Sequence, residues 1–139
     1  MSMIFLTRKE HFNAAHKLAR ADWSDEKNNA VFGKCSNPNW HGHNYTLYVT
    51  IKGKPSVETG FVMDLKQLSS IIKTQIIDEI DHKNVNLDVT WMRGIMPSTE
   101  NLAIAIFSRL KALIMELGAD LHSVKLHETD NNYVEYFGQ

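Results

Sequence analysis

The 139-residue sequence contains a single cysteine and only three prolines, and it has no long hydrophobic run. One cysteine cannot form an internal disulfide and is typical of a reducing compartment. The first apolar stretch is short and is followed directly by charged residues, which does not fit a signal peptide. No window is long and apolar enough to span a membrane. We therefore expect a cytoplasmic protein that makes no membrane contact.

The sequence also lacks an excess of charge of one sign. Fifteen Lys and Arg residues face 16 Asp and Glu residues, for a net charge of −1. Without a basic run or stripe, a role in nucleic-acid binding is disfavoured. The hydrophobic content of 43% is typical of a globular protein, and 139 residues have room for a real core. We see no repeat or linker, and we predict one domain over residues 1–139.

Apolar periodicity predicts four strands and two long helices. The expected strands are 3–16, 44–53, 122–128 and 133–137. One helix follows Asp64 and covers 65–80, and the second opens within 97–101 and ends at Gly118. A short helix or ordered loop is expected from Ser24 to Gly33. Residues 81–84 are predicted to form a polar loop.

The order ββααββ predicts an α+β fold with an antiparallel sheet and both helices on one face of it. The other face and the edge strands would stay exposed, which is a liability for a monomer. Pairing of edges between subunits would close a barrel and remove those edges. We therefore predict an oligomeric barrel, with Thr46, Tyr48 and Thr50 lining a semi-polar interior.

Two histidines separated by one glycine indicate a metal site. In an extended segment, His41 and His43 point to the same side, roughly 7 Å apart at their backbones. Zinc takes three or four nitrogen or sulfur ligands, and a catalytic zinc keeps one position open. His16 follows two small residues at the end of the first strand and is the third candidate, although a histidine there can also be a plain surface residue.

Cys35 and the pair Asp81–His82 are candidates for chemistry near that metal. Cys35 is either a fourth ligand that closes a structural site or a free thiolate that acts as a base. The residues alone leave both interpretations open. Asp81 can orient the imidazole of His82 for proton transfer, or both residues can simply be solvated in a loop.

Glu128 has the strand parity of apolar residues, so its carboxylate is expected to point into apolar surroundings. It then needs a positive charge or hydrogen-bond donors. A ligand with two adjacent N–H groups, such as a 2-amino-4-oxo pyrimidine ring, would satisfy both oxygens, and a salt bridge to a neighbouring subunit is the alternative. Ser98, Thr99 and Glu100 begin a helix, where they can either contact a ligand or only cap the helix.

Taken together, these motifs resemble the 6-pyruvoyl-tetrahydropterin synthase family. The resemblance covers nearly the whole chain, in one order and with compatible spacing, and five motifs together are highly specific. The motifs are Cys35 separated by five residues from His41-Gly42-His43-Asn44, together with His11-Phe12-Asn13-Ala14-Ala15-His16, Asp81-His82-Lys83-Asn84, Ser98-Thr99-Glu100-Asn101 and Glu128-Thr129-Asp130-Asn131-Asn132.

The resemblance implies a T-fold (tunnelling fold) enzyme that assembles as a hexamer of two stacked trimers, with its sites between subunits. The implied substrate is 7,8-dihydroneopterin triphosphate, from which triphosphate is eliminated with internal redox to give 6-pyruvoyl-tetrahydropterin, the reaction of a carbon–oxygen lyase of tetrahydrobiopterin biosynthesis. The implied roles are zinc binding by His16, His41 and His43, proton abstraction by Cys35, proton relay by Asp81 and His82, and pterin binding by Glu128, Thr99, Glu100 and Ser98.

Two alternatives accompany this interpretation. The sister branch, 6-carboxytetrahydropterin synthase of queuosine biosynthesis, shares fold, zinc and substrate but is a carbon–carbon lyase that releases acetaldehyde. The five-residue gap after Cys35 resembles the pyruvoyl branch, whereas Trp40 stands where the best-known members have a small residue. A protein of another class, a non-catalytic zinc-stabilised assembly module, would use Cys35 to close the metal site.

Overall fold

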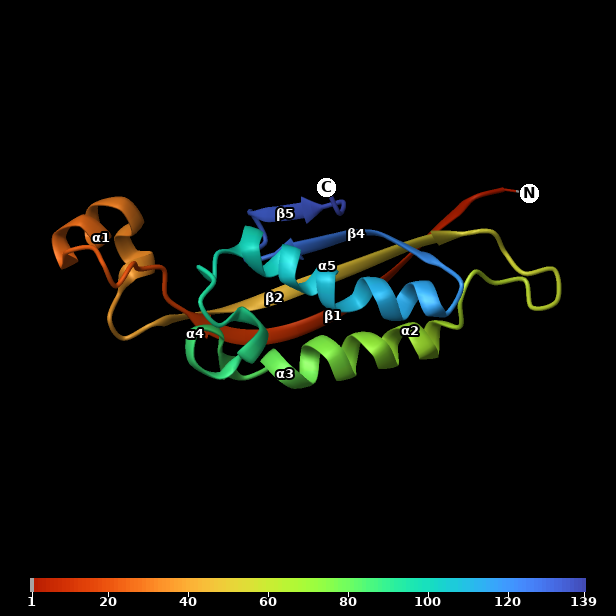
Figure 1. Cartoon of the computed structure of the whole chain (residues 1–139), viewed down its shortest axis with the longest axis horizontal. Helices are drawn as coiled ribbons and strands as arrows, with labels where there is room; N and C mark the ends of the chain where they lie inside the picture. Colours follow the sequence, from red (N-terminus) through yellow and green to blue (C-terminus); the bar gives the residue numbers. More distant parts are fainter. Residues whose placement is uncertain (1) are drawn as a thin grey trace.

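The computed structural model describes residues 2–139 (Figure 1). The strands are β1 (Ile4–His16), β2 (His41–Gly53), β3 (Lys83–Asn84), β4 (Asp120–His127) and β5 (Tyr133–Tyr136). The α-helices are α1 (Asp25–Phe32), α2 (Leu65–Ile72), α3 (Asp78–Ile80), α4 (Val85–Asp88) and α5 (Thr99–Glu116). Two 3₁₀ segments, η1 (Gly33–Ser36) and η3 (Thr90–Met92), and one π segment, η2 (Lys73–Ile77), complete the elements.

The strands form one sheet in the order β3-β1-β2-β4-β5. The long hairpin β1–β2 is paired without interruption from Ile4 opposite Gly53 to His16 opposite His41. β4 and β5 extend the sheet in antiparallel fashion, as predicted. The prediction of a loop over 81–84 is wrong for Lys83 and Asn84, which pair in parallel with β1. Two residues are too few to show a strand period in a sequence.

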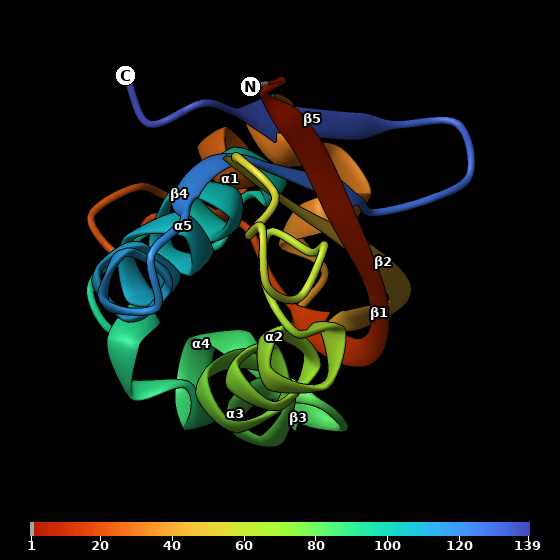
Figure 2. The same ribbon diagram turned by 90° about the vertical axis from the view of Figure 1, so that its right-hand side faces the viewer.

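Side chains of alternating positions build the core on one face of the sheet. In β2, Leu47, Val49 and Ile51 are fully buried, while their neighbours in the strand are only half-buried. Figure 2 shows α2, α3 and α5 on the same side of this curved sheet, with β1 and β2 on the right of the picture. The predicted α+β layer with helices on one face is confirmed.

Both long helices begin at the residues that the sequence indicates. The Asp64 side chain accepts a hydrogen bond from the N–H of Lys66, and the Ser98 hydroxyl accepts one from the N–H of Asn101. Such caps satisfy backbone donors that have no partner inside a helix. The predicted helix 65–80 is continuous, but η2 widens its middle into a π turn before α3.

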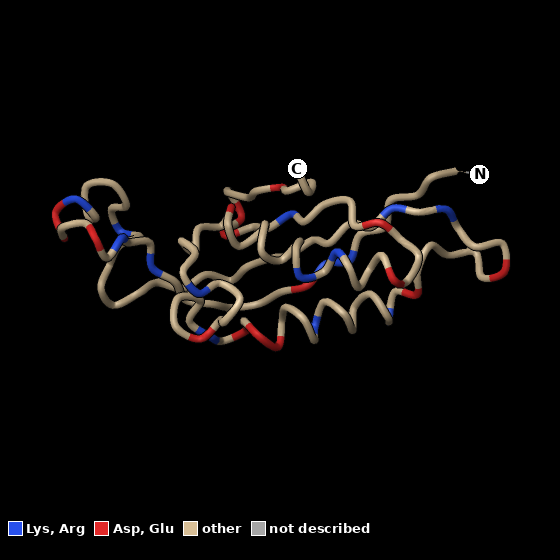
Figure 3. Tube along the Cα trace, in the orientation of Figure 1, with Lys and Arg blue, Asp and Glu red and all other residues tan. Residues whose placement is uncertain are grey.

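The segment between β1 and β2, residues 17–40, forms an arm that extends beyond the end of the sheet (Figure 1). Its helix α1 is capped by Ser24 and ends at Gly33, which has a positive φ of 58°. The side-chain amide of Asn28 is buried and bonds both the N–H and the carbonyl of Arg20, which folds the arm back on itself. Figure 3 shows acidic and basic residues interspersed along the arm.

The sheet face that no helix covers carries rings and ammonium groups. The Lys125 ammonium lies 4.3 Å from the centroid of the Tyr133 ring and 5.4 Å from that of Tyr48. The hydroxyls of Thr7 and Thr50 are 2.7 Å apart on the same face. Closure of this face into an oligomeric barrel stays a prediction. Within residues 2–139, no helix combines the length and hydropathy that a membrane span requires.

Candidate metal centre and active site

The three predicted metal ligands converge at the end of the β1–β2 hairpin. His16 of β1 pairs with His41, the first residue of β2, and His43 follows two residues later on β2, opposite Ala14. Their ring centroids are 4.5, 4.9 and 5.1 Å apart. One ligand nitrogen from each ring lies within 4.8 Å of the other two. His41 and His43 therefore lie on one face of β2, as their strand parity predicts.

A backbone carbonyl orients the most buried of the three rings. The Nδ1 of His16 lies 2.8 Å from the carbonyl oxygen of Pro97, just before α5. Because a carbonyl oxygen only accepts, Nδ1 carries the proton and Nε2 holds a free lone pair. A metal-binding histidine is typically held in this way through its other nitrogen. The sequence did not indicate this contact, since it joins residues that are 81 positions apart.

The nitrogens that face the cluster are buried and have no hydrogen-bond partner in the protein. Nε2 of His16, Nδ1 of His41 and Nε2 of His43 all lack a hydrogen bond. Burial lowers the pKa of each of the three imidazoles below its ordinary value. Neutral rings offer lone pairs, and three unpartnered lone pairs around one point fit a metal ion.

Glu128 lies beside the histidines, directly after β4. Its carboxylate oxygens are 3.6 Å from Nε2 of His43 and 3.9 Å from Nε2 of His16. The hydroxyl of Thr99 donates to the carboxylate at 2.5 Å. Side-chain exposure of 26% leaves the carboxylate accessible to a small molecule. The Glu128 side chain points toward the apolar face, as expected. Its hydrogen-bond partner within the chain is the Thr99 hydroxyl at the N-terminus of α5.

Tyr45 lies beside the histidines, although its place in the sequence indicates only an apolar strand position. It is buried, its ring centroid lies 5.6 Å from that of His43, and its hydroxyl has no hydrogen-bond partner. Burial, together with the charge of Glu128, raises the pKa of the Tyr45 phenol well above its ordinary range. The sequence does contain a signal for this position: Tyr45 has the parity of the buried residues in its strand, and a buried hydroxyl needs a hydrogen-bond partner.

The other residues at the start of α5 differ in their placement. Ser98 caps the helix, and Glu100 is exposed. Thr99 is buried and is the member of the three that contacts Glu128.

Cys35 lies in η1, half-buried, and its carbonyl accepts the N–H of Leu18 at 2.7 Å. This bond joins the beginning of the arm to its second half. The metal-capable group found among residues 2–139 contains the three histidines and does not include the Cys35 thiol. This geometry favours an open three-histidine site over a closed four-ligand site.

Asp81 and His82 form a hydrogen-bonded pair at the outer edge of β1. The Asp81 carboxylate lies 3.0 Å from Nδ1 of His82 and accepts the backbone N–H of Asn13 at 2.9 Å. The pKa of Asp81 is lowered, first by that N–H and then by His82. The His82 side chain is 81% exposed and its φ is 61°, an uncommon value for a residue with a side chain. Neither residue belongs to the three-histidine group.

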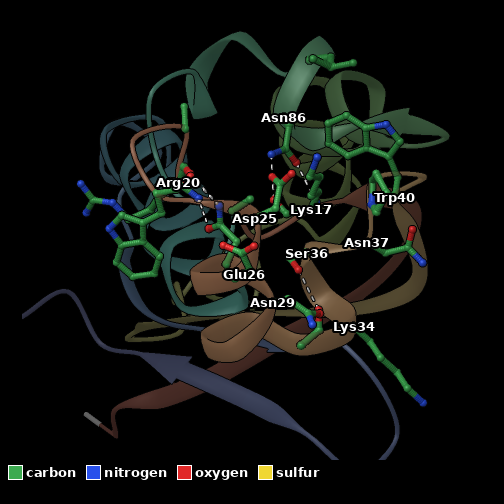
Figure 4. A pocket seen from close by; sticks show the side chains of 17 residues that line it. Lys17, Arg20, Asp25, Glu26, Asn29, Lys34, Ser36, Asn37, Trp40 and Asn86 are labelled. Atoms are coloured by element: carbon green, nitrogen blue, oxygen red, sulfur yellow. Dashed lines mark hydrogen bonds between the residues drawn. The ribbon is translucent and has the colours of Figure 1, made fainter.

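A cavity of about 1230 Å³ lies between the arm and α4, and Figure 4 shows the side chains that line it. Lys34 and Ser36, the two neighbours of Cys35 in η1, line this cavity. So do Lys17 and Trp40, which adjoin two of the histidines in the sequence. The cavity thus connects the cysteine segment with the end of the hairpin that carries the metal ligands.

The fold and the site define a class: a small α+β protein with an open three-histidine centre next to a carboxylate. A family model described as 6-pyruvoyl tetrahydropterin synthase matches residues 5–139. The 6-pyruvoyl tetrahydrobiopterin synthase of Homo sapiens is 41% identical over 134 residues, which are 96% of this chain and 91% of the human protein. The chain belongs to the 6-pyruvoyl tetrahydropterin synthase family, a family of pterin-synthesising lyases.

Other relatives support the same placement. The structure of the Caenorhabditis elegans 6-pyruvoyl tetrahydropterin synthase has a TM-score of 0.92 at 34% identity, with coverage of 100% of this chain and 98% of that one. This similarity confirms the predicted T-fold. The 6-carboxy-5,6,7,8-tetrahydropterin synthase of Haemophilus influenzae is more distant, at 29% identity over 96% of this chain and 99% of that protein.

Proposed function

We propose that this chain, as one T-fold domain, is a zinc-dependent synthase that converts 7,8-dihydroneopterin triphosphate into 6-pyruvoyl-tetrahydropterin and releases triphosphate. The observation that carries the proposal is the convergence of three unpartnered imidazole nitrogens beside the Glu128 carboxylate. The higher identity to relatives named for the pyruvoyl product, 41% against 29%, supports this branch over the carboxy branch.

The donor set fits zinc. Three neutral imidazoles with an open fourth position are typical of catalytic zinc, and imidazole ligands suit it better than they suit magnesium or calcium. Bound zinc makes nearby substrate hydroxyls more acidic and so eases removal of the adjacent C–H protons. His16, His41 and His43 would hold it, with the Pro97 carbonyl fixing the ring of His16.

Glu128 is proposed to anchor the pterin ring. Its two carboxylate oxygens can accept the two adjacent N–H groups of the pyrimidine edge in a bidentate contact. The Thr99 hydroxyl, which donates at 2.5 Å, holds the carboxylate in one orientation. A ring anchored this close to the histidines places its side chain at the metal centre. Ser98 and Glu100 remain predicted pocket residues.

Cys35 is proposed as the base that removes protons from the substrate side chain, and His82 as the group that returns one, oriented by Asp81. The exposed ring of His82 and the absence of this pair from the three-histidine group of the same chain support a site completed between subunits. We therefore propose a hexamer of two stacked trimers. A cytoplasmic location, predicted from the single cysteine, fits an enzyme that depends on a free thiol.

Mass spectrometry of the products from zinc-loaded protein and 7,8-dihydroneopterin triphosphate, with no added reductant, tests the proposal. We expect 6-pyruvoyl-tetrahydropterin. A carboxy-tetrahydropterin together with acetaldehyde would assign the chain to the sister reaction. No turnover by a verified zinc-loaded hexamer would refute the enzyme and support an assembly module.

The variant Cys35→Ala separates a base from a ligand. A catalytic base predicts that this variant keeps zinc and the oligomer but loses turnover. Joint loss of zinc and oligomer would instead identify Cys35 as a structural ligand.

A further inference from the structure

Trp40, the residue before His41, has a backbone conformation that favours glycine. Its φ is 67°, and within residues 2–139 the other non-glycine residue with a positive φ is His82. Trp40 is the fourth residue of a turn, because its N–H donates to the carbonyl of Asn37 at 3.1 Å. Glycine is favoured at this turn position, since a Cβ crowds the following carbonyl at positive φ. An indole at a strained position next to a metal ligand suggests a functional role.

Lys17 lies against this indole. His16 and His41 are the last paired residues of the hairpin, so Lys17 and Trp40 are the first residues beyond the sheet on each strand. The Lys17 ammonium is 5.4 Å from the centroid of the Trp40 ring. The side-chain amide of Asn86 accepts the N–H of Lys17 at 3.0 Å and donates to its carbonyl at 2.9 Å. Asn86 therefore fixes the backbone of Lys17, and the Lys17 ammonium lies beside the Trp40 indole.

The charge of Lys17 is free to meet a ligand. Among residues 2–139, no carboxylate forms an ion pair with it. An ammonium over an aromatic face keeps N–H donors for a third group. Arg20, across the cavity in Figure 4, already donates two hydrogen bonds to Asp22, at 2.7 and 2.9 Å. Asp25 and Glu26 also line the cavity, from α1, so an anion is favoured on the Lys17 side.

We propose that Lys17 and Trp40 form a clamp that positions the triphosphate of the substrate. This inference rests on the proposed function, because it assigns one part of that substrate. The cavity that both residues line has a volume of about 1230 Å³, above the volume of about 300–1,000 Å³ common for small-molecule sites, so it has room for three phosphates. Lysine binds phosphate as a point charge, and the indole limits the directions that this charge can take.

Calorimetric titration of the zinc-loaded full chain with inorganic tripolyphosphate tests the clamp without turnover. Lys17→Ala is expected to weaken binding about tenfold, the effect of one lost charged hydrogen bond. Trp40→Gly is expected to weaken it about threefold, while Trp40→Phe, which keeps an aromatic face, retains most of the affinity. Lys27→Ala is the matched control, because Lys27 lies over the Trp23 ring at 4.2 Å on the same arm. Its affinity should equal that of the unmodified protein.

Steady-state kinetics give the second readout. Lys17→Ala should raise KM for 7,8-dihydroneopterin triphosphate more than it lowers kcat, and it should leave inhibition by neopterin, which has no phosphates, unchanged. The proposal is overturned if tripolyphosphate does not bind the unmodified protein, or binds Lys17→Ala and Lys27→Ala equally well. Loss of tripolyphosphate affinity in Lys17→Ala without any turnover by the unmodified protein would sustain the clamp and refute the proposed reaction.

Discussion

Replacement of Trp40 by glycine or by alanine separates the backbone cost of this position from the contribution of its side chain. Both variants lose the indole and its contact with Lys17, so these losses cancel between them. Alanine at a φ of 67° keeps the clash of Cβ with the backbone, whereas glycine does not. The clash costs about 1–2 kcal/mol, and the greater chain entropy of unfolded glycine offsets about 0.5–1 kcal/mol of this.

The glycine variant is therefore expected to be more stable than the alanine variant by about 0.7 kcal/mol, the difference of the two central values. Urea unfolding of both variants, at one protein concentration and saturating zinc, measures this difference. The same exchange at Ser108, an exposed position inside α5, is the control. There alanine should be the more stable residue, by about 1 kcal/mol. If alanine is also the more stable residue at position 40, the strain argument is refuted.

Three further predictions concern the metal, the carboxylate pocket and pH. Zinc at 100 times its dissociation constant should raise the free energy of unfolding by about 2.7 kcal/mol, seen as a higher Tm than in chelator; an equal Tm would contradict a metal centre. Thr99→Val should weaken pterin binding about tenfold because Glu128 loses its donor, whereas Thr99→Ser should not; calorimetry with neopterin measures both, and equal affinities would exclude this positioning role. Because the pKa of Asp81 is depressed in the folded chain, its carboxylate contributes stability above its ordinary value of 3.8. That contribution is lost as pH falls through the lowered pKa. The small difference in unfolding free energy between the unmodified protein and Asp81→Asn should therefore shrink between pH 6 and pH 3 in urea titrations. A difference that stays constant over this range would contradict the stabilising role of the Asp81 carboxylate.

Local patterns in the sequence were sufficient for four of the five described strands, the long helices and the shared face of His41 and His43. Strand alternation alone places His41 and His43 on the core face, because the side-chain period of a strand is two. The caps at Asp64 and Ser98 mark both long helices, since a polar side chain there satisfies backbone N–H groups of the first turn. Each of these features depends on residues that are close in the chain.

Other features required the tertiary structure, because they join distant segments or depend on a backbone angle. The Pro97 carbonyl that orients His16 and the Thr99 hydroxyl that holds Glu128 are brought into place by the packing of α5 on the sheet. The parallel pairing of β3 with β1 involves only two residues of β3, which are too few to show a strand period in the sequence. The positive φ of Trp40 arises from its turn and is invisible in composition.

The sequence by itself thus determined which residue types are available for metal and pterin chemistry, and on which face of each strand they lie. Only the tertiary structure decided that three imidazole lone pairs are left unpartnered at one point, and that the Cys35 thiol stays outside their group. The physical reason is that alternation fixes a direction within one strand, whereas the distance between strands, helices and the arm is set by packing across the whole core.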